Sequence, residues 1–168
     1  AHTHWAPPGP LGAGLAAGSA GGPHTDLARA TARFGADLWA RRPFFATGSR
    51  VGAPPDELAP SGQDWGFPPP HREAHRENGY QLFAQSICNA AANAGVRRID
   101  PVMRFLRLFT IPQGFDTSKG TYVEDYAQDL LGILALESVR ANFLVIGEDL
   151  GTVTDEARAT LAEAGVLS

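Results

Sequence analysis

Two carboxylates stand at the ends of short stretches that are predicted to be buried strands. Asp100 ends the stretch 96–100, and Glu148 follows Gly147 after the apolar run 143–146. In parallel α/β folds, ligands bind beyond the carboxyl ends of the strands, so two acids at those ends can face one site. Such a pair suits retaining glycoside chemistry, in which one carboxylate attacks the anomeric carbon and the other protonates the leaving oxygen.

Arg98 lies two residues before Asp100, and alternation along a strand places both side chains on the same face. A guanidinium at that position would hold Asp100 as the ionised carboxylate that attacks. A second interpretation stays open, because acids that follow a strand often cap the next helix, as Asp149 or Asp155 could.

The surrounding pattern indicates alternating helices and strands. Helices are predicted over 71–94, 125–141 and from 154 or 155 to 164, with strands over 96–100 and 143–146. Residues 102–111 fit either a helix or a strand, and 113–121 read as a loop. This order predicts a parallel α/β sheet with right-handed crossovers.

The first part of the chain has a weaker pattern. Residues 1–24 are mostly Ala, Gly and Pro, which predicts a low-complexity or poorly ordered segment, 1–33, before an α/β region at 34–168. A helix is predicted over 25–42. Residues 43–70 follow neither helical nor strand periodicity and contain six prolines from position 54 onward, which predicts a long irregular segment.

Composition narrows the class of protein. The chain has 168 residues, 43% hydrophobic, which suits one buried core but falls short of a complete (β/α)₈ barrel of about 250 residues. A net charge of −4 argues against nucleic acid as a partner, and no apolar run is long enough to span a membrane. Cys88 is the only cysteine, which predicts a cytoplasmic protein, and its flanks predict a buried helical position.

Several blocks, in order over residues 34–167, resemble those of the amylomaltase family, the bacterial 4-alpha-glucanotransferases. The blocks are GAPPD at 52–56, GQDWGFP at 62–68, RID at 98–100, RLF at 107–109, IP at 111–112, GTYV at 120–123, LES at 136–138 and GEDLGTV at 147–153. The resemblance implies a partial (β/α) barrel, a TIM-barrel fragment, with parallel strands and a long irregular substrate loop. It implies transfer of α-1,4-glucan chains between maltooligosaccharides, with no metal or cofactor.

The same resemblance implies roles for individual residues. Asp100 would be the nucleophile, Glu148 the general acid/base, and Arg98 the support of the nucleophile. The substrate-binding residues on the 43–70 segment would be Gln63, Trp65 and Asp56, with the indole stacking on the apolar face of a glucose ring.

The chain departs from the family pattern at three points. Pro101 replaces the histidine after the nucleophile, Thr154 replaces a proline, and the family's third acid has no counterpart within these 168 residues. Three hypotheses remain: part of a glucanotransferase, an inactive remnant that folds and binds α-glucan, and an unrelated α/β domain with chance matches. A partial barrel would also expose sheet edges, which predicts self-association.

Overall fold

The computed structural model describes residues 24–26, 31–91, 96–100, 102–148 and 153–167. These residues form two compact units. The antiparallel unit contains Arg29–Gly79 and Arg104–Tyr126. The parallel unit contains the N-terminal strand together with Tyr80–Met103 and Ala127–Ser168.

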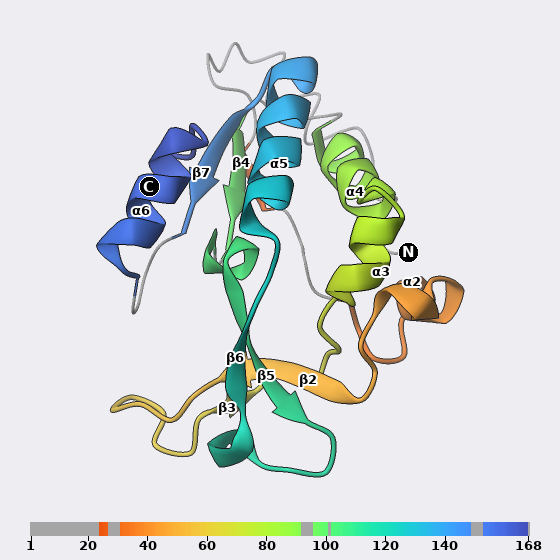
Figure 1. Ribbon diagram of the computed structural model, residues 1–168, viewed down its shortest axis with the longest axis vertical. Helices are drawn as coiled ribbons and strands as arrows, with labels where there is room; N and C mark the ends of the chain where they lie inside the picture. The colour runs from red at the N-terminus through yellow and green to blue at the C-terminus, as the bar shows by residue number, and fades with distance from the viewer. Residues whose placement is uncertain (1–23, 27–30, 92–95, 101, 149–152, 168) are drawn as a thin grey trace. The chain divides into compact units, whose positions relative to one another are not determined.

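A three-stranded parallel sheet forms the centre of the parallel unit. Its strands, in spatial order, are β1 (His24–Asp26), β4 (Val96–Ile99) and β7 (Leu144–Gly147), and Figure 1 shows β4 beside β7. The strands expected at 96–100 and 143–146 are therefore confirmed, as is their parallel pairing.

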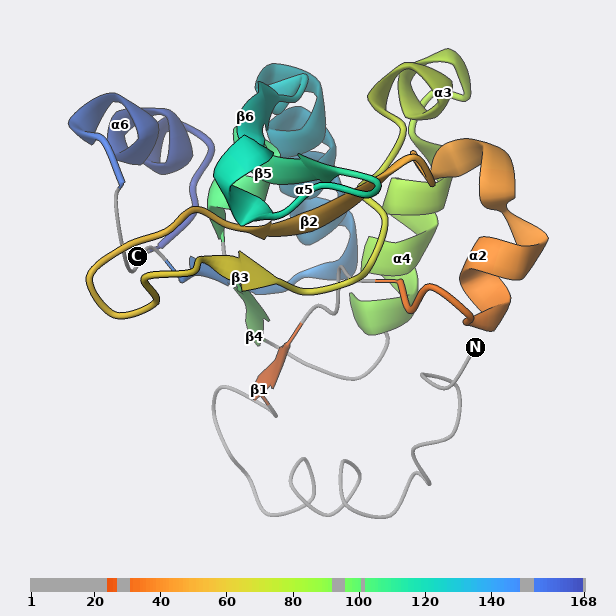
Figure 2. The same cartoon turned by 90° about the horizontal axis from the view of Figure 1, so that it is seen from below.

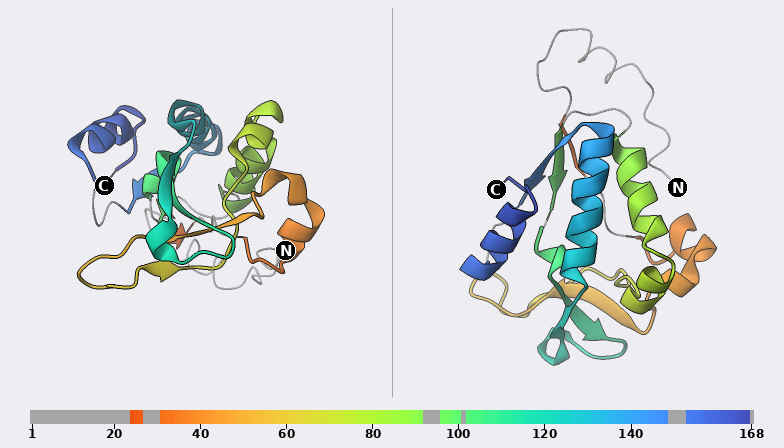
Figure 3. Two further views of the ribbon diagram at one scale, coloured as in Figure 1. Left: turned by 60° about the horizontal axis from the view of Figure 1, so that its bottom comes forward. Right: turned by 45° about the horizontal axis from the view of Figure 1, so that its top comes forward.

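Two long helices and one short one complete the parallel unit. They are α4 (Gln81–Ala91), α5 (Ala127–Ala141) and α6 (Asp155–Glu163), and Figure 3 shows α4 and α5 side by side. Thr154 caps α6, because its hydroxyl accepts a hydrogen bond from the backbone N–H of Ala157. The helices predicted over 125–141 and from 154 or 155 onward are confirmed, and their inward residues are almost completely buried: Phe83, Ile87, Leu130, Leu131, Leu134 and Leu161.

The prediction of one helix over 25–42 is wrong. Its first residues form β1, and the only α-helix in the described part of that range is α2 (Ala36–Ala40). A strand of three residues is too short to show alternation, so its parallel pairing with β4 has no local signal in the sequence. After α2, Pro43 lies in the short 3₁₀ helix η1 (Arg42–Phe44).

The helix expected over 71–94 is divided. Its two parts are α3 (Arg72–Glu77), which belongs to the antiparallel unit, and α4. Gly79 and Tyr80 separate them with φ angles of +61° and +55°, left-handed values that a continuous helix does not allow. Residues 92–94 lie outside the described residues.

The prediction that Cys88 is buried is also wrong, because the residue is exposed on α4. Its thiol donates a hydrogen bond of 3.0 Å to the Glu137 carboxylate on α5. The bond to Glu137 raises the pKa of the Cys88 thiol, since it favours the protonated form. The helical pattern located the residue correctly but assigned it to the wrong face.

The second sheet is antiparallel, in contrast to the expectation of parallel strands. Its order is β3 (Gln63–Asp64), β2 (Ser49–Ala53), β5 (Arg107–Pro112) and β6 (Thr121–Glu124), and Figure 2 shows β2 between β3 and β5. The 43–70 segment is therefore partly regular. Prolines lie before, between and after the two strands. Only Val51 and Gly52 of β2 are buried, so the strands show no alternation of apolar and polar residues.

The region 102–111 contains both kinds of structure. A 3₁₀ helix, η2 (Val102–Phe105), is followed by β5. The expected loop 113–121 holds the 3₁₀ helix η3 (Thr117–Lys119) and leads into β6, whose four residues are all exposed and so give no apolar alternation. None of the helices in the described part of the chain is long and apolar enough to cross a membrane.

Candidate active site

Asp100 and Glu148 follow two strands that are paired directly in the parallel unit. The register joins Ile99 of β4 to Gly147 of β7, so the two acids are the next residues at the same carboxyl edge. The backbone N–H of Glu148 donates to the Ile99 carbonyl at 2.9 Å, and the Val102 N–H donates to the Glu148 carbonyl at 3.0 Å. The backbone therefore brings the two predicted acids together.

Arg98 and Asp100 form an ion pair between Nη2 and Oδ2. Their side chains are 43% and 45% exposed, so the pair lies at the accessible edge of the sheet. The neighbouring Arg97 alternates to the opposite face and is only 3% exposed, and burial lowers the pKa of its guanidinium. Of the two consecutive arginines, the structure thus pairs Arg98 with the candidate nucleophile, as its spacing predicted.

Strand β1 brings a further acidic position to this edge. Its register places Asp26 beside Arg98 on the neighbouring strand. The sequence pattern placed Asp26 within the helix expected over 25–42 and assigned it no part in the site. A three-residue strand offers no alternation, so the signal that could have placed Asp26 was the pairing itself, which is non-local.

Gly147 allows close packing at the end of β7. A Cβ at this position would lie 2.8 Å from Cγ2 of Val102 and 3.0 Å from Cγ1 of Val166. Val102 is fully buried and begins η2 immediately after the Asp100 turn. The absence of a side chain at Gly147 therefore lets the segment after the candidate nucleophile pack against the strand that carries Glu148.

Gln63 and Trp65 lie on or next to β3 in the antiparallel unit. The indole Nε1 donates to the Gln63 side-chain oxygen at 2.9 Å, and the Trp65 ring is stacked on Phe67 with centroids 6.0 Å apart. Val51 holds the backbone on both sides, since its carbonyl accepts from Trp65 N–H and its N–H donates to the Phe67 carbonyl. Trp65 remains 42% exposed and can contact a ligand.

The third predicted residue of the 43–70 segment, Asp56, has local partners. Its Oδ1 accepts hydrogen bonds from the backbone N–H groups of Leu58 at 2.9 Å and Ala59 at 2.6 Å. This arrangement is an Asx-type turn that shapes the segment. Its substrate contact stays a prediction.

Two arginines anchor the 43–70 segment and the helix that follows it. Arg50 of β2 donates to Asp64 at 2.7 Å and also to the Pro112 and Phe115 carbonyls. At the other end, Arg72 of α3 donates to the Glu124 carbonyl at 2.8 Å.

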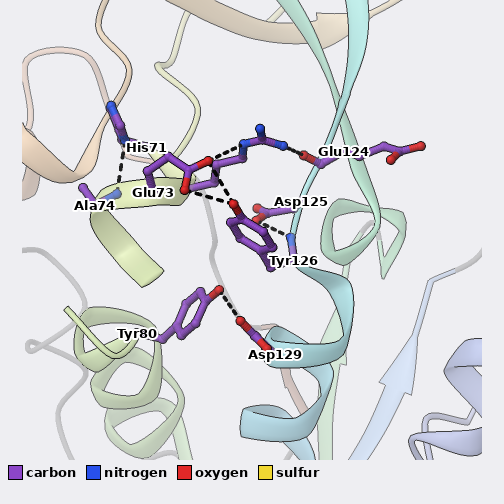
Figure 4. Close-up of polar contacts among 9 residues, drawn as sticks. His71, Glu73, Ala74, Tyr80, Glu124, Asp125, Tyr126 and Asp129 are labelled. Carbon is purple, nitrogen blue, oxygen red and sulfur yellow. Dashed lines mark hydrogen bonds and ion pairs between the residues drawn. The ribbon is translucent and has the colours of Figure 1, made fainter. Parts of the chain in front are cut away.

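A tyrosine beside the end of β6 reinforces the second anchor. Figure 4 shows the Tyr126 hydroxyl directed at the Glu73 carboxylate, to which it donates at 2.9–3.0 Å. The Arg76 guanidinium lies 4.4 Å from the centre of the Tyr126 ring, within cation–π range. The segment is thus held by polar contacts at both ends.

The predicted residues fall into two groups. Asp100, Glu148 and Arg98 lie in the parallel unit, whereas Gln63, Trp65 and Asp56 lie in the antiparallel unit. Two hollows of about 470 and 310 Å³ occur in the antiparallel unit, and neither is lined by Asp100 or Glu148. Among the described residues, no group of three or more His, Cys, Asp or Glu side chains has an arrangement that could hold a metal ion.

A family profile, curated relatives and solved structures that resemble this chain all point to the same family. The family profile described as 4-alpha-glucanotransferase matches residues 21–168. Similar proteins include the 4-alpha-glucanotransferases of Haemophilus influenzae, 42% identical over 147 residues, and Mycobacterium tuberculosis, 42% identical over 153 residues. These alignments cover 88% and 91% of this chain but only 21% of each relative, so the chain spans about a fifth of their length.

Solved structures resemble the chain over most of its length. The amylomaltase of Corynebacterium glutamicum matches with a TM-score of 0.89 and 36% identity, covering 93% of this chain and 22% of that one. The amylomaltase of Streptococcus agalactiae, solved in complex with acarbose, shares the fold with a TM-score of 0.76 at 19% identity, covering 84% and 30%. With an ordered set of sequence blocks, a matching profile and a matching fold, the chain belongs to the 4-alpha-glucanotransferase family.

Proposed function

We propose that this chain carries the nucleophile and the acid/base of an enzyme that transfers α-1,4-glucan chains. The observation that supports the proposal is the Ile99–Gly147 register, which sets Asp100 and Glu148 side by side at one strand edge, with Arg98 paired to Asp100. Retaining glycosidases place two carboxyl groups about 5 Å apart, a spacing that neighbouring strands allow.

The proposed reaction has two displacements. Asp100 attacks the anomeric carbon of the donor glucan, the glycosidic bond breaks, and Glu148 gives its proton to the leaving oxygen. Glu148 then takes the proton of an acceptor hydroxyl as that oxygen attacks the same carbon and releases Asp100. The anomeric configuration is retained, and Arg98 orients the Asp100 side chain through their ion pair at the start and end of the cycle.

Substrate recognition is assigned to the 43–70 segment. The exposed indole of Trp65 offers an apolar face to a glucose ring, and Gln63 orients the indole through its hydrogen bond. Asp56 keeps the turn between the two strands in shape. The partner in this proposal is an α-1,4-glucan or a maltooligosaccharide, handled without a cofactor.

The parallel sheet is proposed to be part of a (β/α) barrel. Strands β1, β4 and β7 are parallel, and α5 connects the segment after β4 to β7, as barrel crossovers do. The antiparallel sheet is then an insertion that carries the aromatic residues. Support comes from the likeness to the Corynebacterium glutamicum amylomaltase.

Disproportionation of maltotriose tests the proposed activity. The chain should release glucose from maltotriose as longer maltooligosaccharides form, and Asp100→Asn and Glu148→Gln should each abolish release. Glu163→Gln, an exposed acid at the end of α6, is the matched control and should keep full activity. Equal glucose release by the wild-type and Asp100→Asn chains would refute the assigned nucleophile.

A second candidate is glucan binding without turnover. It is favoured by the contacts that hold the Trp65–Phe67 pair within the antiparallel unit. Binding of maltoheptaose by calorimetry, with no glucose released from maltotriose, would support this candidate. Loss of binding in Trp65→Ala would identify the surface.

A further inference from the structure

We propose that Arg104 is a positioning residue, which orients the Trp65–Phe67 aromatic pair through a contact with the Phe67 ring. The inference rests on the proposed function, because it assigns the pair to glucan recognition. Arg104 lies on η2 and is only 8% exposed. Its guanidinium carbon is 5.9 Å from the centre of the Phe67 ring, within the range of about 6 Å for a cation–π contact.

The contact continues from the buried cation to the exposed indole. Phe67 is stacked on Trp65 with an angle of 20° between the ring planes, and Trp65 donates to Gln63. In the row of contacts from Arg104 through Phe67 to Trp65, the buried member is the charged guanidinium. The exposed member is the indole that offers its face to a sugar. A change at Arg104 therefore reaches Trp65 through Phe67, without any direct contact between Arg104 and the ligand.

Physical chemistry explains why an arginine suits this position. A charged side chain that is taken out of water needs a compensating partner, and the negative face of an aromatic ring supplies part of that compensation. The planar guanidinium also restricts the tilt of the ring more than a methylene chain would. Phe67 is itself half-buried, and cation–π contacts are stronger where the groups are shielded from water.

Arg104 lies outside the 43–70 segment that carries the recognition residues. Arg104 follows Asp100 by four positions, and η2 is the element that continues the chain after the candidate nucleophile. Arg104 and Phe67 both belong to the antiparallel unit, so the angle of the recognition aromatic depends on a residue outside the 43–70 segment. We expect Arg104 to affect glucan affinity through the orientation of Trp65.

A double-mutant cycle tests the inference in a chain in which Trp65 is the sole tryptophan, made by Trp5→Phe and Trp39→Phe. In this background Arg104→Gln and Phe67→Leu are made singly and together, with Arg104→Lys as the conservative variant. Acrylamide quenching reports the exposure of Trp65, and calorimetry with maltoheptaose reports affinity. Arg158→Gln, on the exposed side of α6, is the control that should change neither.

We expect each single variant to raise the quenching constant and to weaken maltoheptaose binding by about threefold to tenfold. The double variant should be no worse than either single one, because both remove the same contact. Arg104→Lys should restore most of the affinity. Additive effects, or unchanged quenching in both single variants, would overturn the inference.

Two arms keep the inference separate from the proposed function. If Arg104→Gln fails to fold by circular dichroism, Phe67→Leu and its quenching decide the question. If the starting chain does not bind maltoheptaose, glucan recognition fails for this chain, while the quenching cycle still decides whether Arg104 positions Trp65.

Discussion

Replacing Gly52 by alanine should detach β3, the short strand that begins the Gln63–Trp65 region. A Cβ at position 52 would lie 2.0 Å from the Gln63 carbonyl oxygen and 2.8 Å from Cδ1 of Ile111. The Ile111 methyl group can rotate away, but the Gln63 oxygen belongs to the backbone that pairs with Ala53. The clash is therefore relieved by separation of β3 from β2.

The loss of stability can be worked from the backbone hydrogen bonds that β3 makes with β2. Two residue pairs, Gly52–Asp64 and Ala53–Gln63, join the strands. Each backbone hydrogen bond contributes about 0.5–1.5 kcal/mol net, so the free energy of unfolding should fall by about 1–3 kcal/mol. Overpacking in a tight site costs a similar amount. Glucan affinity should fall with it, since Trp65 follows β3 directly.

Urea unfolding and acrylamide quenching of Trp65, both in the Trp5→Phe, Trp39→Phe background, measure the two effects. Gly48→Ala is the matched control, because no atom lies within 4 Å of a Cβ at that position and its φ is not left-handed. The control should differ from the wild-type chain by less than about 0.5 kcal/mol. If Gly52→Ala matched the control in both stability and quenching, the proposed role of the close β2–β3 approach would be refuted.

Three further outcomes are expected. Gly132→Ala, on the exposed face of α5 with nothing within 4 Å of the new Cβ, should raise the free energy of unfolding by about 0.5–1 kcal/mol in urea, and a loss would contradict the regular helix there. The Cys88 hydrogen bond, followed by the bond from Arg140, lowers the pKa of Glu137, so its stabilisation is present above the unfolded pKa of a glutamate and is lost as pH falls through the lowered folded pKa. Urea midpoints taken from pH 6 down to pH 3 should thus fall more steeply in the wild-type chain than in Glu137→Gln, and parallel curves would oppose this reasoning. The chain should also self-associate through its sheet edges, and a monomer by light scattering over a range of concentrations would contradict that expectation.

The sequence predicted those parts of the fold that have strong local patterns. The helix at 127–141 shows its apolar face through Leu130, Leu131 and Leu134, the run before Glu148 is continuously apolar, and the short stretch before Asp100 begins with Val96 and ends with Ile99. Because strands that alternate with helices pair in parallel, these two signals also predicted that the acids would meet. The spacing of Arg98 and Asp100 predicted the ion pair in the same way.

The antiparallel sheet was not predicted, because its strands have no readable period. All residues of β6 are exposed, β3 has two residues, and β2 is surrounded by prolines. Its stability comes instead from non-local contacts, such as Arg50 with Asp64 and Arg72 with Glu124. The positions of Asp26 and Arg104 depend on pairings between distant segments, for which a single sequence offers no signal.

Trapping of the glycosyl-enzyme tests the central claim most directly. α-Maltotriosyl fluoride has a leaving group that departs without protonation, so a Glu148→Gln chain can still be glycosylated but lacks the base that activates the acceptor. Mass spectrometry of proteolytic peptides should then find a maltotriosyl group on Asp100, and no adduct in the Asp100→Asn, Glu148→Gln double variant. An adduct on another residue, or none on Asp100, would contradict the assignment of these two acids.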